Sequence, residues 1–292
     1  MRIATVIHQG RRRVGRLGAD GQTIELYEID GSLGALPLIE LAAAGTGLPI
    51  SGSVALADVR LIAPLPMPRR NLWCVGRNYH AHAKELRGSV FKDNSKAVDA
   101  WPIVFTKVPE CVVGPDDDVR LPTAISCQID YEAELLLVIG RGGRNIKRAD
   151  AMAHVYGYSI VNDVTARDVQ MRHGQWDLGK SFDTFCPMGP WIVTADELDG
   201  RDTRVRCWVT PAGGQPELRQ DARTTDLIFD IPALIETCSR GITLLPGDII
   251  ATGTPAGVGM GLSPPRWLQH GDVVRISIDG IGTLENRFVE GD

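Results

Sequence analysis

The pattern of hydrophobic and polar positions along the chain is strand-rich and helix-poor. After residue 70, strand-like runs lie at 71–75, 103–107, 131–139, 156–162, 191–194, 204–209, 248–252 and 272–278. Helix-like runs lie at 79–86, 149–154, 166–173 and 227–239. Gly241 is placed to end the last of these helices, and Asp279-Gly280 is typical of a hairpin turn. The chain is therefore expected to be an α+β protein that is mostly β.

Three alternating prolines at positions 64, 66 and 68 interrupt this pattern and favour an extended linker. Short strand-like and helix-like runs precede them, so we expect a small α+β N-terminal domain at 1–68 and a larger catalytic domain at 69–292. Two long stretches, 87–100 and 253–270, have no periodic pattern. Loops of that length are usually functional, and the first is a candidate for a lid that closes over a site.

Composition narrows the function classes. The chain has 292 residues, of which 43% are hydrophobic and 23% charged, as in an ordinary globular protein. Its net charge of −5 provides no basic excess for nucleic acid. The sequence contains no apolar run long enough to span a membrane, and the N-terminus has no signal-peptide pattern. Six cysteines without a CxxC pair argue against a thiolate zinc site. We therefore expect a cytoplasmic protein that binds neither membranes nor nucleic acid.

The most informative strand contains two glutamates on one face. Glu132 and Glu134 share a face with apolar residues further along the strand, and the opposite face is apolar as well. Two adjacent carboxylates at the edge of a core repel each other, so they must be protonated, paired with Lys or Arg, or bound to a cation. The alternative is a strand end at which both side chains lie in solvent.

A third carboxylate follows the next strand. Asp163 comes directly after the apolar run 155–161, where it could cap the following helix or join the two glutamates. Three carboxylates with no His or Cys beside them suit Mg²⁺, Mn²⁺ or Ca²⁺ better than zinc. Arg167 and Gln170 lie three positions apart and share one face of the helix that follows.

Other polar residues are candidates for catalysis. His82 and Glu85 are three apart on a short predicted helix, where the carboxylate could orient the imidazole as a base. The alternative is a solvated helix in which His82 has no role. Lys180 is either a partly buried cation or surface charge. The glycine-rich segment 251–259 could offer backbone N–H groups to an anion, but it lacks the lysine of a phosphate-binding P-loop.

Taken together and in order, five segments of the chain resemble the fumarylacetoacetate hydrolase family. They are GRNYHAHAKEL (76–86), DYEAELLLVIG (130–140), GYSIVNDVTARDVQ (157–170), GKSFDTFCPMGPW (179–191) and GDIIATGTPAGVG (247–259). The resemblance runs from about residue 70 to the C-terminus. It implies a mixed β-sheet rolled into a flattened barrel with short peripheral helices, assembled as a homodimer.

The resemblance also implies roles for individual residues. Metal ligands would be Glu132, Glu134 and Asp163; catalytic residues would be His82, Glu85 and Lys180; substrate-binding residues would be Arg167, Gln170 and Thr254. The implied cofactor is Mg²⁺ or Mn²⁺, with Ca²⁺ as a substitute in crystals. The segment 87–100 matches the family's lid in position but not in sequence, so it does not identify the substrate.

The first expectation is a metal-dependent hydrolase that cleaves the C–C bond of an acylpyruvate or related 2,4-dioxo acid, as in aromatic catabolism. His82 would activate water, Lys180 would stabilise the oxyanion, and pyruvate would leave as an enolate held at the metal. The alternative keeps the metal but omits the attack by water. It is a decarboxylase, isomerase or hydratase of oxaloacetate-type or 2-hydroxymuconate-type 2-oxo acids. A third hypothesis is an inactive binding protein of the same fold.

Overall fold

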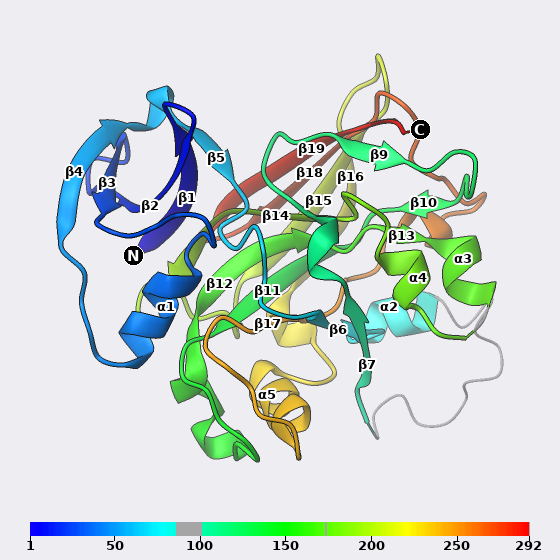
Figure 1. The fold of residues 1–292 in the computed structure, drawn as a ribbon. Helices are drawn as coiled ribbons and strands as arrows, with labels where there is room; N and C mark the ends of the chain where they lie inside the picture. The colour runs from blue at the N-terminus through cyan, green and yellow to red at the C-terminus, as the bar shows by residue number, and fades with distance from the viewer. Residues whose placement is uncertain (86–100, 173, 292) are drawn as a thin grey trace.

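The computed structural model describes residues 1–85, 101–172 and 174–291, and Figure 1 shows their arrangement. The lid expected at 87–100 falls outside these residues. The first part of the chain contains β1 (Arg2–His8), β2 (Arg11–Leu17), β3 (Thr23–Tyr27), α1 (Leu36–Ala43), β4 (Ile50–Ala55), η1 (Leu56–Asp58), β5 (Arg60–Ile62), β6 (Leu72–Gly76), α2 (His80–Glu85), β7 (Ile103–Lys107), η3 (Pro109–Cys111), β8 (Val112–Val113), β9 (Val119–Leu121) and β10 (Ile129–Asp130).

The second part contains β11 (Ala133–Ile139), η4 (Arg148–His154), β12 (Val155–Asn162), β13 (Thr165–Ala166), α3 (Arg167–Arg172), α4 (Asp177–Lys180), β14 (Cys186–Thr194), β15 (Arg204–Thr210), β16 (Glu217–Arg223), η5 (Thr224–Asp226), α5 (Ile231–Ser239), β17 (Ile249–Ala251), η6 (Gly259–Gly261), β18 (Val273–Ile278) and β19 (Gly282–Glu290). The expected fold class, mostly β with short helices, is confirmed.

One large sheet organises the molecule. Its strands follow the order β4-β3-β2-β1-β14-β12-β11-β17-β6-β7, with β5 and β8 attached beside this path. Most neighbours are antiparallel, but β17 pairs with β6 and β14 pairs with β8 in parallel, so the sheet is mixed. A second sheet has the order β16-β15-β18-β19-β9. The path of each sheet has two ends within the described part of the chain, so the expected roll is open rather than a closed barrel.

The N-terminal strands belong to the large sheet. Strand β1 pairs with β14 through Arg2 opposite Val193 and Ile3 opposite Ile192. The segment before the proline run is therefore hydrogen-bonded to the strands that follow it. Among the described residues, no helix is long and apolar enough to cross a membrane.

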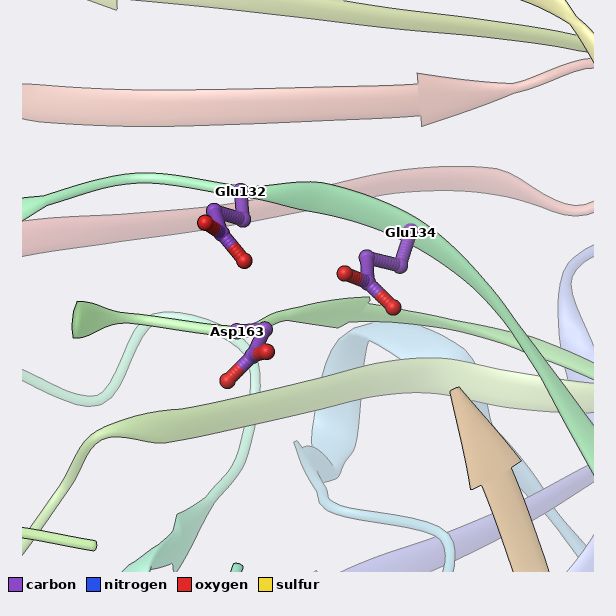
Figure 2. Close-up of side chains that lie close together, drawn as sticks. All are labelled: Glu132, Glu134 and Asp163. Carbon is purple, nitrogen blue, oxygen red and sulfur yellow. The ribbon is translucent and has the colours of Figure 1, made fainter. Parts of the chain in front are cut away.

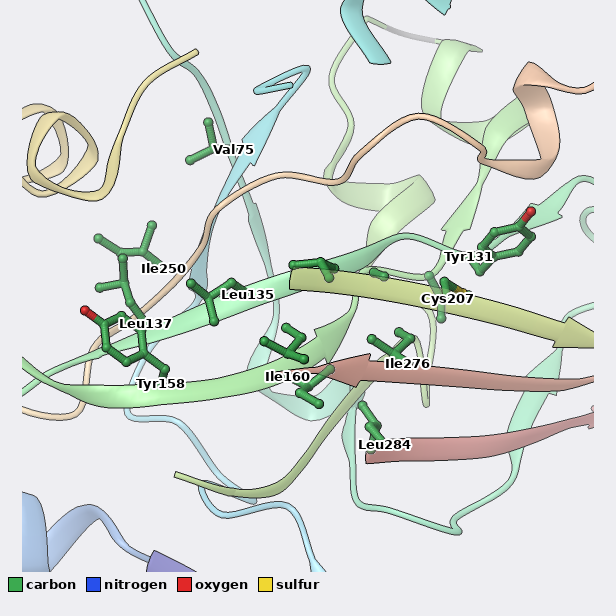
Figure 3. Close-up of a cluster of buried hydrophobic side chains, with 14 of the residues drawn as sticks. Val75, Tyr131, Leu135, Leu137, Tyr158, Ile160, Cys207, Ile250, Ile276 and Leu284 are labelled. Atoms are coloured by element: carbon green, nitrogen blue, oxygen red, sulfur yellow. The ribbon is translucent and has the colours of Figure 1, made fainter. Parts of the chain in front are cut away.

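Strand β11 is buried on both faces, as its sequence predicts. Leu135 and Leu137 face the core between the two sheets, together with Ile160 of β12 and Ile276 of β18 (Figure 3). The β11 side chains that alternate with these two leucines point to the opposite face, into a second buried cluster that includes Ile3 of β1. A strand enclosed in this way is held rigidly, so the residues at its start have fixed positions.

Candidate metal and substrate site

The three acidic residues expected to hold a metal lie side by side. In Figure 2 the side chains of Glu132 and Glu134 point toward Asp163, which directly follows the neighbouring strand β12. One carboxylate oxygen of each lies within 4.8 Å of the others, and all three residues are buried. The register explains this, because Ala133 pairs with Asn162 and the Asp163 amide donates a hydrogen bond to the Glu132 carbonyl. The alternative of two solvated glutamates at a strand end is wrong.

Buried cations compensate two of these carboxylates. Lys180 Nζ lies 2.7 Å from Glu132 Oε2 and 2.7 Å from Asp163 Oδ2. Lys107, a residue that the sequence did not single out, lies 2.8 Å from Asp163 Oδ1. Glu134 differs from both, since the described contacts give it a hydrogen bond of 2.7 Å from the Gly253 amide but no ion pair.

The pKa shifts reflect this difference. Burial alone would raise the pKa of Glu132, but Lys180 and Arg167 outweigh it and lower the pKa to about 2. Burial, and then the charges of Asp163 and Glu132, raise the pKa of Glu134 well above its ordinary value. Among the described residues, Glu134 is therefore the carboxylate of this site that forms no ion pair.

These residues fit a divalent cation. Three carboxylates offer hard oxygen donors within reach of one ion, and Glu134 gains the positive partner that it lacks. Lys180 already contacts Glu132 and Asp163, so a bound ion would compete with this lysine. The structure shows that the triad could hold a metal ion.

The predicted His82–Glu85 pair is formed. His82 Nδ1 lies 3.0 Å from Glu85 Oε2 on α2, and His82 is only 2% exposed. His82 is therefore not a solvated side chain, and its catalytic role stays a proposal. Glu85 also accepts a hydrogen bond of 3.0 Å from the Gly257 amide. This carboxylate thus joins the imidazole to the glycine-rich segment.

Arg167 and Gln170 lie together, but protein groups already engage them. Arg167 donates a hydrogen bond of 2.9 Å to Asp130 and forms an ion pair of 2.6 Å with Glu132. Its remaining terminal nitrogen, Nη1, donates to the Gln170 side-chain oxygen at 3.3 Å. A substrate carboxylate would have to share this guanidinium with two buried acids, so the substrate-binding roles of Arg167 and Gln170 stay a proposal.

The three glycine amides of the glycine-rich segment are engaged by the protein itself. The amides of Gly253, Gly257 and Gly259 donate to Glu134, Glu85 and Asp130. These N–H groups bind the protein's own carboxylates, so the expectation that they receive an external anion is not met.

Thr254 is also engaged by the protein. Its hydroxyl donates to the Ala133 carbonyl at 3.1 Å and accepts from the Gln220 side chain at 2.8 Å. Its substrate-binding role therefore stays a proposal.

One cavity gathers most of these side chains. It is lined by Val75, Gly76, Arg77, His82, Phe105, Glu132, Glu134, Arg167, Gln170, Trp176, Lys180 and Thr254. Sequence reasoning missed three buried polar residues that support it, Lys107, Asp130 and Gln220. Lys107 and Gln220 stand in ordinary strand patterns, and Asp130 was quoted within the segment 130–140 but given no role. Only the contacts formed between distant segments reveal them.

A family model and a curated relative match most of the chain. The family model for the fumarylacetoacetate (FAA) hydrolase C-terminal domain matches residues 71–289. Oxaloacetate tautomerase YisK of Bacillus subtilis is 47% identical over 234 residues, which cover 80% of this chain and 74% of that protein.

Solved structures show the same fold over the whole chain. A fumarylacetoacetate hydrolase from Exiguobacterium antarcticum is 41% identical with a TM-score of 0.84, and the match covers 100% of both chains. A 5-carboxymethyl-2-hydroxymuconate delta-isomerase from Mycobacterium smegmatis is 35% identical with a TM-score of 0.78, again over 100% of both chains.

Proposed function

The chain belongs to the fumarylacetoacetate hydrolase family, and from this premise we propose that it is a metal-dependent tautomerase of an oxaloacetate-type 2-oxo acid. The observation that carries the proposal is the cavity that brings His82 and Lys180 beside the acidic triad. Relatives named for oxaloacetate tautomerisation and hydroxymuconate isomerisation support it. They favour the second of the sequence-based hypotheses over hydrolysis, and they favour an enzyme over an inactive binding protein.

Tautomerisation requires only a group that transfers a proton and a group that stabilises negative charge on the substrate. It moves one proton between C3 and the 2-oxo oxygen and leaves every carbon–carbon bond intact. Glu85 holds Nδ1 of His82, which leaves Nε2 to take the proton from C3. The electron pair of the broken C–H bond becomes the C2=C3 double bond, and the imidazolium returns the proton to the oxygen. Lys180 is the buried cation beside the charge that develops on that oxygen.

Glu132, Glu134 and Asp163 would hold the divalent ion, for which we propose Mg²⁺ or Mn²⁺. The ion would supply Lewis-acid stabilisation of negative charge on the substrate oxygens. Lys107 keeps Asp163 in place from the side of β7.

Hydrolysis of an acylpyruvate is the second candidate. The buried His82–Glu85 pair favours it, because the same base could activate a water molecule. The similarity to a structure named as a fumarylacetoacetate hydrolase favours it as well.

A panel assay separates these functions. Protein stripped with EDTA is supplied with Mg²⁺, Mn²⁺ or no metal. It is then given enol-oxaloacetate, whose decay is followed by its ultraviolet absorbance, or acetylpyruvate, whose cleavage is followed by pyruvate formation. We expect metal-dependent acceleration of the enol-to-keto conversion over a protein-free control with the same metal. Cleavage of acetylpyruvate without acceleration of tautomerisation would replace the proposal with the hydrolase, and release of CO₂ from oxaloacetate as the main reaction would replace it with the decarboxylase.

A further inference from the structure

Two aromatic side chains line the cavity, and the proposed chemistry gives neither of them a role. Phe105 lies in β7, two residues before Lys107, and Trp176 directly precedes α4, which carries Lys180. Their rings meet edge to face, with centroids 5.2 Å apart and planes at 61°. Lys180 Nζ lies 4.8 Å from the centre of the Phe105 ring. The Lys180 ammonium group therefore lies beside the Phe105 ring, which together with Trp176 forms an aromatic wall of the cavity.

The Trp176 ring is fixed by close packing. A Cβ atom placed on Gly76 would overlap this ring, and its distance to Trp176 Cη2 would be 2.8 Å. The indole thus occupies the space that a side chain at position 76 would take. The same ring packs against the buried pair Val258 and Met260 at the end of the glycine-rich segment. With contacts to β6, to Phe105 and to this segment, the ring has little freedom to move aside.

The wall borders a small space. The cavity has a volume of about 20 Å³, which is room for one or two water molecules. Even a four-carbon acid needs some side-chain movement to enter, and each further carbon adds to that demand. The acidic triad, Lys180 and His82 are needed for the proposed chemistry, and Phe105 and Trp176 are the aromatic side chains of the remaining lining. We therefore expect an added apolar substituent to meet the aromatic wall.

We propose that Trp176 is a specificity-determining residue that restricts this site to short 2-oxo acids, with a substituent at C3 no larger than a carboxylate. The inference rests on the proposed tautomerase function and names its substrate class: four-carbon 2-oxo dicarboxylic acids are accepted, and 2-oxo acids with a bulky or aryl group at C3 are rejected. Rejection by an aromatic wall is a matter of volume, and one misfitting group in an apolar pocket is typically worth roughly 10–200-fold in kcat/KM.

The test compares two substrates that differ only in the group at C3. Oxaloacetate has a carboxylate there and phenylpyruvate has a phenyl ring, and both undergo keto–enol conversion. The variants are Trp176→Ala and the milder Trp176→Leu, in full-length protein loaded with Mg²⁺. We expect kcat/KM for phenylpyruvate to rise at least roughly tenfold, while that for oxaloacetate changes much less. Trp208→Ala is the matched control, because it removes the same side chain from β15, which does not line the cavity.

Binding supplies a second readout that needs no turnover. Calorimetry with Mg²⁺ present measures the affinity for oxalate, which has no C3 substituent, and for phenylpyruvate. The expected result is tighter binding of phenylpyruvate by both Trp176 variants at unchanged affinity for oxalate. If both variants keep their thermal stability and oxalate affinity but gain neither binding nor turnover of phenylpyruvate, the inference is overturned. If the native chain does not tautomerise oxaloacetate, the proposed function fails, and the binding data alone still decide the role of Trp176.

Discussion

At the scale of single residues, Glu134 lies in an electrostatically unfavourable environment. It is buried beside Glu132 and Asp163, and the described contacts provide it with no ion pair. Burial and the charges of Asp163 and Glu132 raise its pKa well above the ordinary value, so at a pH above the ordinary pKa of a glutamate the folded state binds more of this proton than the unfolded state does. Stability without metal therefore falls as pH rises above the ordinary pKa of a glutamate, until the raised pKa is passed.

Replacing Glu134 by Gln removes this cost. We expect Glu134→Gln to raise the Tm of metal-free protein at pH 7–8 and to abolish both metal-dependent activity and the stabilisation by added Mg²⁺. Thermal unfolding with EDTA and with Mg²⁺ measures both effects. Glu217→Gln, an exposed residue of β16, is the control and should change neither. A lower Tm for metal-free Glu134→Gln would contradict the electrostatic account.

His82 is predicted to act in proton transfer and not in metal binding, because its described side-chain partner is Glu85. His82→Ala should lower turnover by roughly two orders of magnitude or more, the usual contribution of a positioned base. Binding of Mn²⁺, followed by calorimetry, should stay within error of the native protein. Unchanged turnover would remove His82 from the mechanism, and lost metal binding would assign it a different role.

The sequence predicted these residues better than their surroundings. The ExE pair alone also fits a solvent-exposed strand end, and the Asp after the next strand also fits a helix cap, so the cation site is expected only once the ordered segments are read together as a family resemblance. By contrast, Lys107 ends an ordinary strand, and nothing in its neighbourhood indicates that it is fully buried against Asp163. Its partner lies 56 positions away, so only the pairing of the strands brings the two together.

At the scale of elements, the turn that follows β17 holds three acidic side chains of the site in place through its backbone amides. Its amides bind Glu134 of β11, Glu85 of α2 and Asp130 of β10, which are three different elements. Gly257 is central to this turn. Its φ is +101°, and a Cβ there would collide with the Arg219 backbone carbonyl of β16.

We therefore expect Gly257→Ala to lower the Tm by roughly 5 °C or more, since backbone strain and collision add together. Loss of activity should accompany it, because Glu85 would lose the amide that holds it. Gly213→Ala is the matched control: Gly213 also has positive φ, +70°, but nothing lies within 4 Å of its missing Cβ. Equal Tm values for the two variants would show that the collision has no effect.

Element types were predictable where the pattern was strong. The strand predicted at 131–139 and the helix predicted at 227–239 are confirmed, and each begins a few residues later than predicted. Asp230 caps this helix, and Gly241 follows it with a φ of +77°. The predicted helix at 149–154 is instead the 3₁₀ segment η4, and strand β16 was missed. The sequence of β16, ELRQDAR, has almost no apolar residues, and its pairing with β15 makes it a strand.

At the scale of the whole molecule, the N-terminal strands and the acidic site share one sheet. Ile3 of β1 pairs with Ile192 of β14 and belongs to the same buried cluster as Leu136 of β11. The sequence predicts two domains divided between residues 68 and 69. The proline run suggests this division, but it carries no information on whether strands of the two predicted domains pair with each other.

A truncated chain tests that division. We expect residues 69–292 alone to aggregate or to unfold at least roughly 10 °C below the full chain, because the edge of β14 and the cluster around Leu136 lose their cover. Size-exclusion chromatography with light scattering and thermal unfolding measure this, and they also test the predicted homodimer in the full chain. A soluble fragment with native Tm would establish an independent catalytic domain. The cytoplasmic location stays a prediction.

The double contact of Lys180 with Glu132 and Asp163 has a consequence for how the protein is made. Lys180 provides an internal counter-ion for two of the three carboxylates, so we expect the chain to fold before any metal binds. If the triad binds a divalent ion as proposed, that ion would take over contacts that an ammonium group makes in this structure. The ion should consequently be acquired late and released readily, and the activity should follow the supply of free divalent ions in its surroundings.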